Sequence, residues 1–182
     1  MSERSKDLIR LALLMAVFCS LTSAHAQIRT AEALPHDYPG YHLLRLTERD
    51  ADTRAFLVQH FKTSDASVVH ADFNGDGNLD YAMLLKSDTS AAAKVVVLLC
   101  DAQSKCRGVF EQDITGYSEG AYLSRLPVGS RVAEVGSAEG EKESHPVKLT
   151  NTGIQVTYFE KGAVALYWDK KLKKIVGVGT AE

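Results

Sequence analysis

The sequence lacks an excess of either charge, a long apolar run and most of the common catalytic signatures. Its 182 residues include 21 basic and 23 acidic side chains, without a cluster of Lys and Arg that exceeds a solvated face, which argues against electrostatically driven binding of nucleic acid. A membrane-spanning helix needs about 20 apolar residues, and the longest such run is shorter. The chain contains no His-Glu-x-x-His and no phosphate-binding glycine loop, and its one Gly-x-Ser-x-Gly string, Gly116-Tyr117-Ser118-Glu119-Gly120, lies in a segment whose pattern favours neither helix nor strand. An enzyme is therefore not the class that the sequence favours.

The N-terminus has the pattern of a secretory signal peptide. Its parts are the basic residues Arg4, Lys6 and Arg10, an apolar run over Leu11–Leu21, and the small-x-small site Ala24-His25-Ala26. Cleavage before Gln27 would remove residues 1–26 and leave one domain, 27–182, with a net charge of −3. The alternative is an uncleaved anchor, for which the apolar run is short. We expect a periplasmic or secreted protein without a transmembrane segment in the mature chain.

Cysteine is rare, and its spacing is informative. Of three cysteines, Cys100 and Cys106 lie in the predicted mature domain, with five residues between them. In an oxidising compartment, an even pair at this distance predicts a structural disulfide. Zinc would need further ligands that the flanking residues do not supply, and a catalytic redox pair is typically separated by two residues. We expect a hairpin that is stapled across its turn.

The apolar periodicity predicts an α+β fold. Residues 48–61 favour an amphipathic helix with Thr47 as its N-cap, packed on an antiparallel β-sheet. The predicted strands are 67–71, 79–86, 94–99 and 107–114, followed by an antiparallel meander over 147–178. The strand 79–86 is almost entirely apolar, which is typical of a strand that is buried on both faces. With the helix placed before the strands, the order does not suggest alternating βαβ units.

Between the first two predicted strands lies an unusually dense group of oxygen ligands. Counting from Asp72, side-chain oxygens occupy positions 1, 3, 5 and 9, and the backbone carbonyl of position 7 adds another; the residues are Asp72, Asn74, Asp76, Asn78 and Asp80. Gly75 and Gly77 allow the backbone to turn tightly between them. Oxygen donors at alternate positions suit Ca²⁺ better than zinc, copper or magnesium. The alternative is a metal-free Asx and glycine turn, in which three carboxylates would repel one another without compensation.

An EF-hand does not account for this loop. Position 12 of an EF-hand is a bidentate Glu, but here it is Met83. The residues after the loop also lack the polar face of a helix. The loop is therefore predicted to join two strands.

The segment from Ala71 to Ala82 resembles the core of the FG-GAP/VCBS repeat, in which Asp-Phe-Asn-Gly-Asp-Gly and a following Asp lie between two strands. By this resemblance, Asp72, Asn74, Asp76 and Asp80 would bind calcium through side chains and Asn78 through its carbonyl. The motif covers residues 67–86 approximately and occurs once, whereas a propeller needs about four or more blades. The layout also resembles small exported bacterial proteins that end in a Tyr-Trp-Asp strand, here Tyr167-Trp168-Asp169.

The leading functional hypothesis is an exported, calcium-stabilised, non-catalytic module that presents a protein- or glycan-binding surface. The alternatives are an exported hydrolase with a dispersed active site and a periplasmic inhibitor or immunity-type protein. Trp168, Tyr167 and Tyr158 suit the core of the meander better than an aromatic binding patch. A pull-down from a periplasmic extract would separate the module from the enzyme, and a structure with calcium would show whether an aromatic or charged concavity exists.

Overall fold

The computed structural model describes residues 37–61, 66–133 and 146–180. The predicted signal peptide at 1–26 lies outside these residues. The chain divides into two compact units, Met1–Pro39 and Gly40–Glu182, and the description below concerns the second. Within the described ranges, no helix is long and apolar enough to cross a membrane.

The first sheet has five strands, all paired antiparallel. They are β1 (Tyr41–Leu43), β2 (Val68–Ala71), β3 (Asp80–Ser87), β4 (Ala93–Cys100) and β5 (Cys106–Asp113). Both β1 and β2 pair along one edge of β3, while β4 pairs along its other edge and β5 completes the sheet. In β3 and β4, side chains on both faces are buried, as the continuous apolar sequence of these strands predicts.

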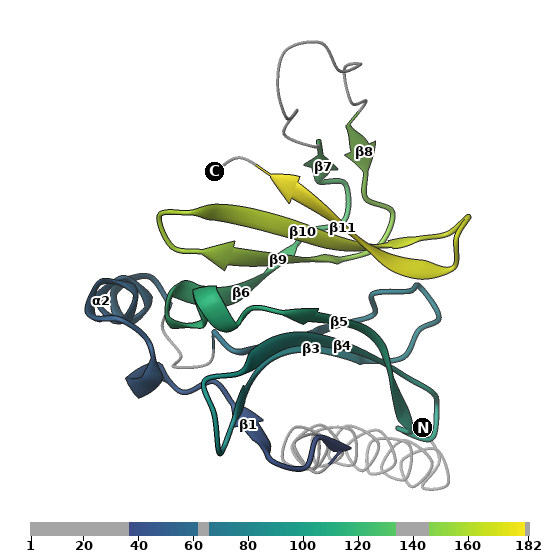
Figure 1. The fold of residues 1–182 in the computed structure, drawn as a ribbon. Coiled ribbons are helices and arrows are strands. Elements are labelled where there is room, and N and C mark those ends of the chain that lie inside the picture. The colour runs from purple at the N-terminus through teal and green to yellow at the C-terminus, as the bar shows by residue number, and fades with distance from the viewer. Residues whose placement is uncertain (1–36, 62–65, 134–145, 181–182) are drawn as a thin grey trace, which may run out of the picture. The chain divides into compact units, whose positions relative to one another are not determined.

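The second sheet has four antiparallel strands in the order β11-β10-β9-β6. They are β6 (Ala121–Leu126), β9 (Gly153–Tyr158), β10 (Gly162–Asp169) and β11 (Lys174–Thr180). A separate ribbon pairs β7 (Arg131–Val132) with β8 (Val147–Lys148). Figure 1 shows this ribbon rising beside the second sheet.

The two sheets are stacked around one hydrophobic core (Figure 1). The first sheet contributes Ala82, Leu84, Val95 and Val97, and the second contributes Leu123, Ile154, Val156 and Leu166. The sequence suggested one sheet with a meander. The structure instead forms two layers, because the 3₁₀ turn η3 (Thr115–Gly120) carries the chain from β5 into β6, and the apolar faces of both sheets then cover each other. The coarse class, α+β with antiparallel sheets, is confirmed.

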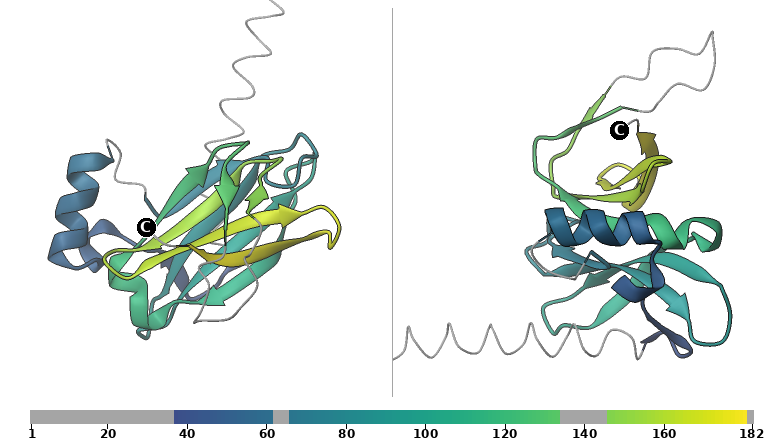
Figure 2. Two further views of the ribbon diagram at one scale, coloured as in Figure 1. Left: turned by 90° about the horizontal axis from the view of Figure 1, so that it is seen from above. Right: turned by 90° about the vertical axis from the view of Figure 1, so that its left-hand side faces the viewer.

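The helix α2 spans Ala51–His60 and follows a short 3₁₀ turn, η2 (Leu46–Glu48). Its N-cap is Asp50, whose carboxylate accepts a hydrogen bond from Thr53 N, so the predicted cap at Thr47 is wrong. The residues after Thr47 form the 3₁₀ turn instead of the first helical turn. The helix lies at one side of the stacked sheets (Figure 2), where the Phe56 ring meets those of Tyr122 and Phe159.

Candidate metal site

The oxygen-rich loop joins β2 to β3, and its base is a paired antiparallel ladder in which Ala71 faces Asp80. The side chain of Phe73 is buried in the core between the sheets and anchors the loop from inside. Gly75 and Gly77 have φ values of 81° and 87°, a conformation that costs any other residue free energy. The loop therefore has the inter-strand position and the two tight turns that its sequence predicts.

Asp72 organises the backbone of the loop. Its Oδ1 accepts hydrogen bonds from Gly75 N at 2.6 Å and Asp76 N at 3.1 Å, and its Oδ2 accepts one from Gly77 N at 2.8 Å. Three backbone donors thus converge on one carboxylate. This arrangement holds the loop in a closed turn and places the Asp72 carboxylate at its centre.

Asn74 and Asp76 contact each other at the exposed tip of the loop. Asn74 Nδ2 donates to Asp76 Oδ2 at 2.9 Å, while Asn74 Oδ1 accepts from Asp76 N at the same distance. Asn78 N donates to Asp76 Oδ1 at 2.8 Å. The hydrogen bond from Asn74, together with that from Asn78, lowers the pKa of Asp76 below its ordinary value. Asp76 is therefore a solvent-facing anion at neutral pH.

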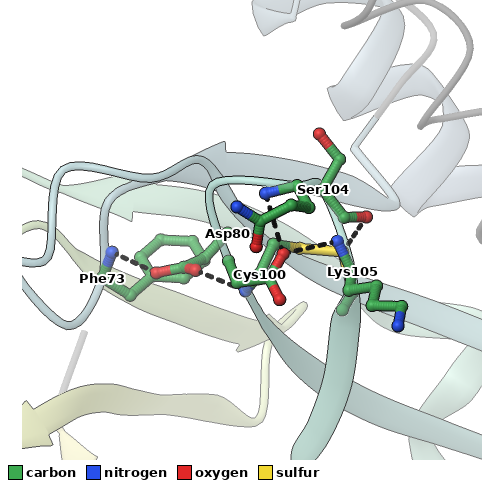
Figure 3. The surroundings of a disulfide bond; sticks show 8 residues. Phe73, Asp80, Cys100, Ser104 and Lys105 are labelled. Atoms are coloured by element: carbon green, nitrogen blue, oxygen red, sulfur yellow. Dashed lines mark hydrogen bonds between the residues drawn. A yellow bond between two sulfur atoms is a disulfide. The ribbon is translucent and has the colours of Figure 1, made fainter.

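Asp80 has a different environment, because its side chain has no exposed surface. Its Oδ2 accepts a hydrogen bond from Phe73 N at 2.9 Å, and its Oδ1 accepts one from Cys100 N at 3.0 Å (Figure 3). Burial raises the pKa of this carboxyl group, and the nearby charge of Asp76 acts in the same direction. Asp80 thus connects the loop to the end of β4.

The predicted disulfide is present between Cys100 and Cys106, with Cα atoms 3.9 Å apart. It closes the β4–β5 hairpin, whose turn is held by Asp101: its Oδ1 accepts from Gln103 N and Lys105 N, each at 2.9 Å (Figure 3). Because Cys100 N also donates to Asp80, the hairpin turn and the oxygen-rich loop share an anchor. A disulfide fits an oxidising compartment.

The ligand atoms that the loop offers are of the type that a hard cation prefers. Every predicted ligand offers oxygen, and each carboxylate oxygen has two lone pairs, so the hydrogen bonds of Asp72 and Asp80 leave acceptor capacity. The geometry is not that of an assembled centre, since no three His, Cys, Asp or Glu side chains in the described ranges are grouped as metal ligands. Asp72, Asn74 and Asp76 lie at one exposed turn, whereas Asp80 is directed inward. Binding a cation would require these side chains to draw together around it.

A hollow of about 590 Å³ lies between this loop and the disulfide hairpin. Asn74, Asp76 and Asn78 line it from the loop, and Lys105 and Arg107 line it from the hairpin. The exposed ligand candidates therefore face a space that a partner group can enter.

Asn151 is a functional neighbour of the loop that the sequence did not indicate. Its Nδ2 donates to Phe73 O at 3.1 Å, and a Cβ on Gly75 would lie 2.9 Å from the same nitrogen. The contact joins residues 78 positions apart, from the turn between β8 and β9 to the loop of the first sheet. No local pattern around Asn151 signals it.

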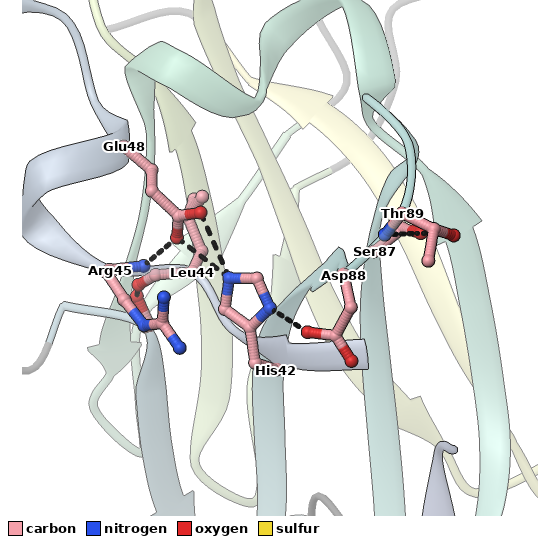
Figure 4. A network of polar contacts seen from close by, with 8 residues as sticks. His42, Leu44, Arg45, Glu48, Ser87, Asp88 and Thr89 are labelled. Atoms are coloured by element: carbon pink, nitrogen blue, oxygen red, sulfur yellow. Dashed lines mark hydrogen bonds and ion pairs between the residues drawn. The ribbon is translucent and has the colours of Figure 1, made fainter. Parts of the chain in front are cut away.

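His42 forms a second polar network that the sequence did not indicate. Its Nδ1 lies 2.7 Å from Asp88 Oδ1 and its Nε2 lies 3.0 Å from Glu48 Oε1 (Figure 4). Arg45 N also donates to Glu48. Burial alone would raise the pKa of Glu48, but the hydrogen bonds from Arg45 and His42 outweigh it and hold that pKa below its ordinary value. With both ring nitrogens engaged, His42 fastens β1 to η2 and to the turn after β3.

The fold and the loop together define an antiparallel two-sheet α+β domain with an oxygen-rich inter-strand loop. Comparisons with protein-family models, with curated proteins and with solved structures found no match. Function must therefore be inferred from the residues themselves.

Proposed function

We propose that this chain is an exported, calcium-stabilised module, without catalytic activity of its own, that presents a protein- or glycan-binding surface. In this proposal the loop is a single FG-GAP/VCBS-type unit, and the chain reaches the periplasm or the medium after its signal peptide has been removed. The observation that carries the proposal is the closed turn around Asp72, with oxygen ligands at alternate positions and two glycines at positive φ. A cation there would neutralise the mutual repulsion of the exposed carboxylates.

The residues that would hold Ca²⁺ are Asp72, Asn74 and Asp76 through their side chains and Asn78 through its carbonyl, with Asp80 at the base of the loop. Calcium would supply a positive charge and additional bonds across the turn. Because a ligand that binds only the folded state stabilises it, the free energy of unfolding should rise by about 2.7 kcal/mol when calcium is present at about 100 times its Kd.

The test is a calcium titration of the exported protein. The full-length chain is expressed in a bacterium and recovered from the periplasm, and mass spectrometry establishes whether its N-terminus is Gln27. Calorimetry and thermal unfolding are then measured with Ca²⁺, with Mg²⁺ and with a chelator. We expect heat of binding and a rise in Tm with calcium, and a smaller response with magnesium.

Asp76→Asn is the diagnostic variant, because Asp76 is exposed and its loss leaves the anchors at Asp72 and Asp80 in place. Asp101→Asn is the matched control: Asp101 also accepts backbone hydrogen bonds in an exposed turn, but it lies on the hairpin. The calcium response should fall strongly in Asp76→Asn and be unchanged in Asp101→Asn. An absence of heat and of any Tm change in the wild type at millimolar calcium would refute the calcium part of the proposal.

A further inference from the structure

A second hollow, of about 320 Å³, lies at the end of β10 and beside β8. Tyr167, Trp168 and Asp169 line it from β10, and residues 147–151 line it from β8 and the following turn. The volume is at the lower end of that found for small-molecule sites.

Two aromatic rings in its wall are held by packing on different sides of the second sheet. Trp168 packs against the main core between the sheets. Tyr167 packs against a small separate cluster of Val132, Leu149 and Ala165. Both rings are partly buried and held in place. The Tyr167 ring packs on the same side as Leu149, so it offers a fixed apolar face to the hollow, at little cost in conformational entropy on binding.

The charge around these rings is positive. Three lysines, Lys148, Lys170 and Lys171, line the hollow together with one carboxylate, Asp169. Asp169 Oδ1 accepts hydrogen bonds from Leu172 N and Lys171 N, and these bonds, that from Leu172 first, lower the pKa of Asp169. Asp169 is therefore an ionised acceptor suited to hydroxyl groups, while the lysines outnumber it as partners for an anion.

Asn151 adds a positioned amide to the same wall. Its Nδ2 donates to Phe73 O, so the position of the amide is fixed by the base of the oxygen-rich loop. The hollow thus combines an apolar ring face, a hydroxyl acceptor, an amide and excess positive charge. A flat aromatic acid would stack on the aromatic face and pair with the lysines. Its carboxylate or its apolar edge would then face the Asp169 carboxylate, which would have no hydroxyl group to accept from. A sugar with a carboxylate uses all four groups, because its ring presents C–H faces and hydroxyls together with one charge.

We propose that this hollow binds an acidic saccharide, with the sugar ring against Tyr167, its carboxylate beside Lys170 and Lys171, and hydroxyls on Asp169 and Asn151. This specifies the glycan-binding part of the proposed function. The saccharide site rests on the proposed function because it is the glycan-binding surface of that proposal. It does not rest on the calcium loop, since none of the residues that line the hollow is a predicted calcium ligand.

The probe is digalacturonate, and neutral galactobiose is the control without the carboxylates. Trp168 is the only tryptophan of the chain, so its fluorescence reports directly on the hollow, and calorimetry gives the Kd. We expect saturable binding of the acidic disaccharide, affinity at least about tenfold weaker for the neutral one, and weakening by added salt.

The variant Lys170→Glu/Lys171→Glu reverses the charge at exposed turn positions and should weaken binding by about tenfold or more. Lys105→Glu/Arg107→Glu makes the same change in net charge at the other hollow and should leave the Kd within about twofold. Absence of saturable binding, equal binding of the neutral sugar, or equal effects of the two double variants would overturn the proposal. All titrations are run with calcium and with a chelator: binding in both conditions establishes the saccharide site even if the calcium loop fails its own test, and loss of binding in both refutes the site alone.

Discussion

Replacing Asp80 tests how the loop is anchored without reference to any metal. Asp80→Ala would leave Phe73 N and Cys100 N without their acceptor in a buried place. An unsatisfied buried donor costs about 1–3 kcal/mol, so two donors cost about 2–6 kcal/mol. Part of this cost is offset, because the variant no longer has to bury a carboxylate. Burial of the carboxylate is unfavourable in the wild type, and it raises the pKa of Asp80. We expect the free energy of unfolding to fall by about 3 kcal/mol.

Asp80→Asn separates the two contributions. The amide keeps one oxygen acceptor and removes the buried charge, but its NH₂ group faces the other backbone donor. We therefore expect a loss of about 1–2 kcal/mol, smaller than that of Asp80→Ala. Asp76→Ala is the control, since that side chain is exposed, and it should cost less than about 1 kcal/mol.

The measurement is urea unfolding at equilibrium, with a chelator present and the disulfide intact, so that metal binding does not contribute. Amide hydrogen exchange adds a local readout: the Cys100 amide should exchange faster in Asp80→Ala than in Asp80→Asn, and slowest in the wild type. If Asp80→Ala cost no more than Asp76→Ala, or if protection of Cys100 N were unchanged, the loop would not depend on this carboxylate and the reasoning would be wrong.

Two further predictions concern the neighbours of the loop and the His42 network. Gly75→Ala and Gly77→Ala both place a side chain at positive φ, at about 1 kcal/mol each, but only at Gly75 would the new Cβ lie 2.9 Å from Asn151 Nδ2. Gly75→Ala should therefore lower the urea midpoint further, and the difference should vanish in an Asn151→Ala background; equal losses would show that Asn151 exerts no constraint. Because the folded-state pKa of Glu48 lies below its ordinary value of about 4.5, its stabilising contribution is present above that pH and is lost as pH falls through the folded pKa. Glu48→Gln should therefore make the acid loss of stability less steep in urea midpoints taken from neutral pH to about pH 3, whereas the exposed turn variant Glu160→Gln should follow the wild type.

The sequence predicted those features that depend on neighbours in the chain. The apolar run after Asp80 identified β3 as a doubly buried strand, and the spacing of Cys100 and Cys106 identified the disulfide. Gly75 and Gly77 likewise indicated tight turns, and both have positive φ. The side-chain bonds to the loop backbone join residues two to five positions apart and fit the Asx turn that was the alternative to calcium ligation. Such contacts are local, so their geometry follows from the order of the residues.

Apart from the helix cap at Asp50, which was predicted at Thr47, the features that the sequence did not predict depend on distant segments. The stacking of two sheets depends on which apolar faces meet after η3, and each face taken alone would also fit a single sheet. Asn151 meets Phe73 across 78 residues, and His42 meets Asp88 across 46. The inward direction of Asp80 follows from its pairing position beside β4, where Cys100 N needs an acceptor. Residue type does not reveal which of these partners a polar side chain will find.

The anchors on both sides of the loop determine what a bound cation can do. Asp80 fixes one side to β4 and the disulfide hairpin, and Asn151 fixes the other to the turn between β8 and β9; both contacts join protein groups directly. The side chains of Asp72, Asn74 and Asp76 and the carbonyl of Asn78 remain to bind a cation at the tip of the loop. A switch needs a segment with two arrangements of similar free energy, whereas here the base of the loop is held in one. Calcium should therefore stabilise the exposed turn and leave the positions of Phe73 and Cys100 unchanged, so that amide exchange slows at Gly75 and Gly77 on calcium addition but not at the core strands; large changes in β3 or β4 would instead identify the loop as a switch.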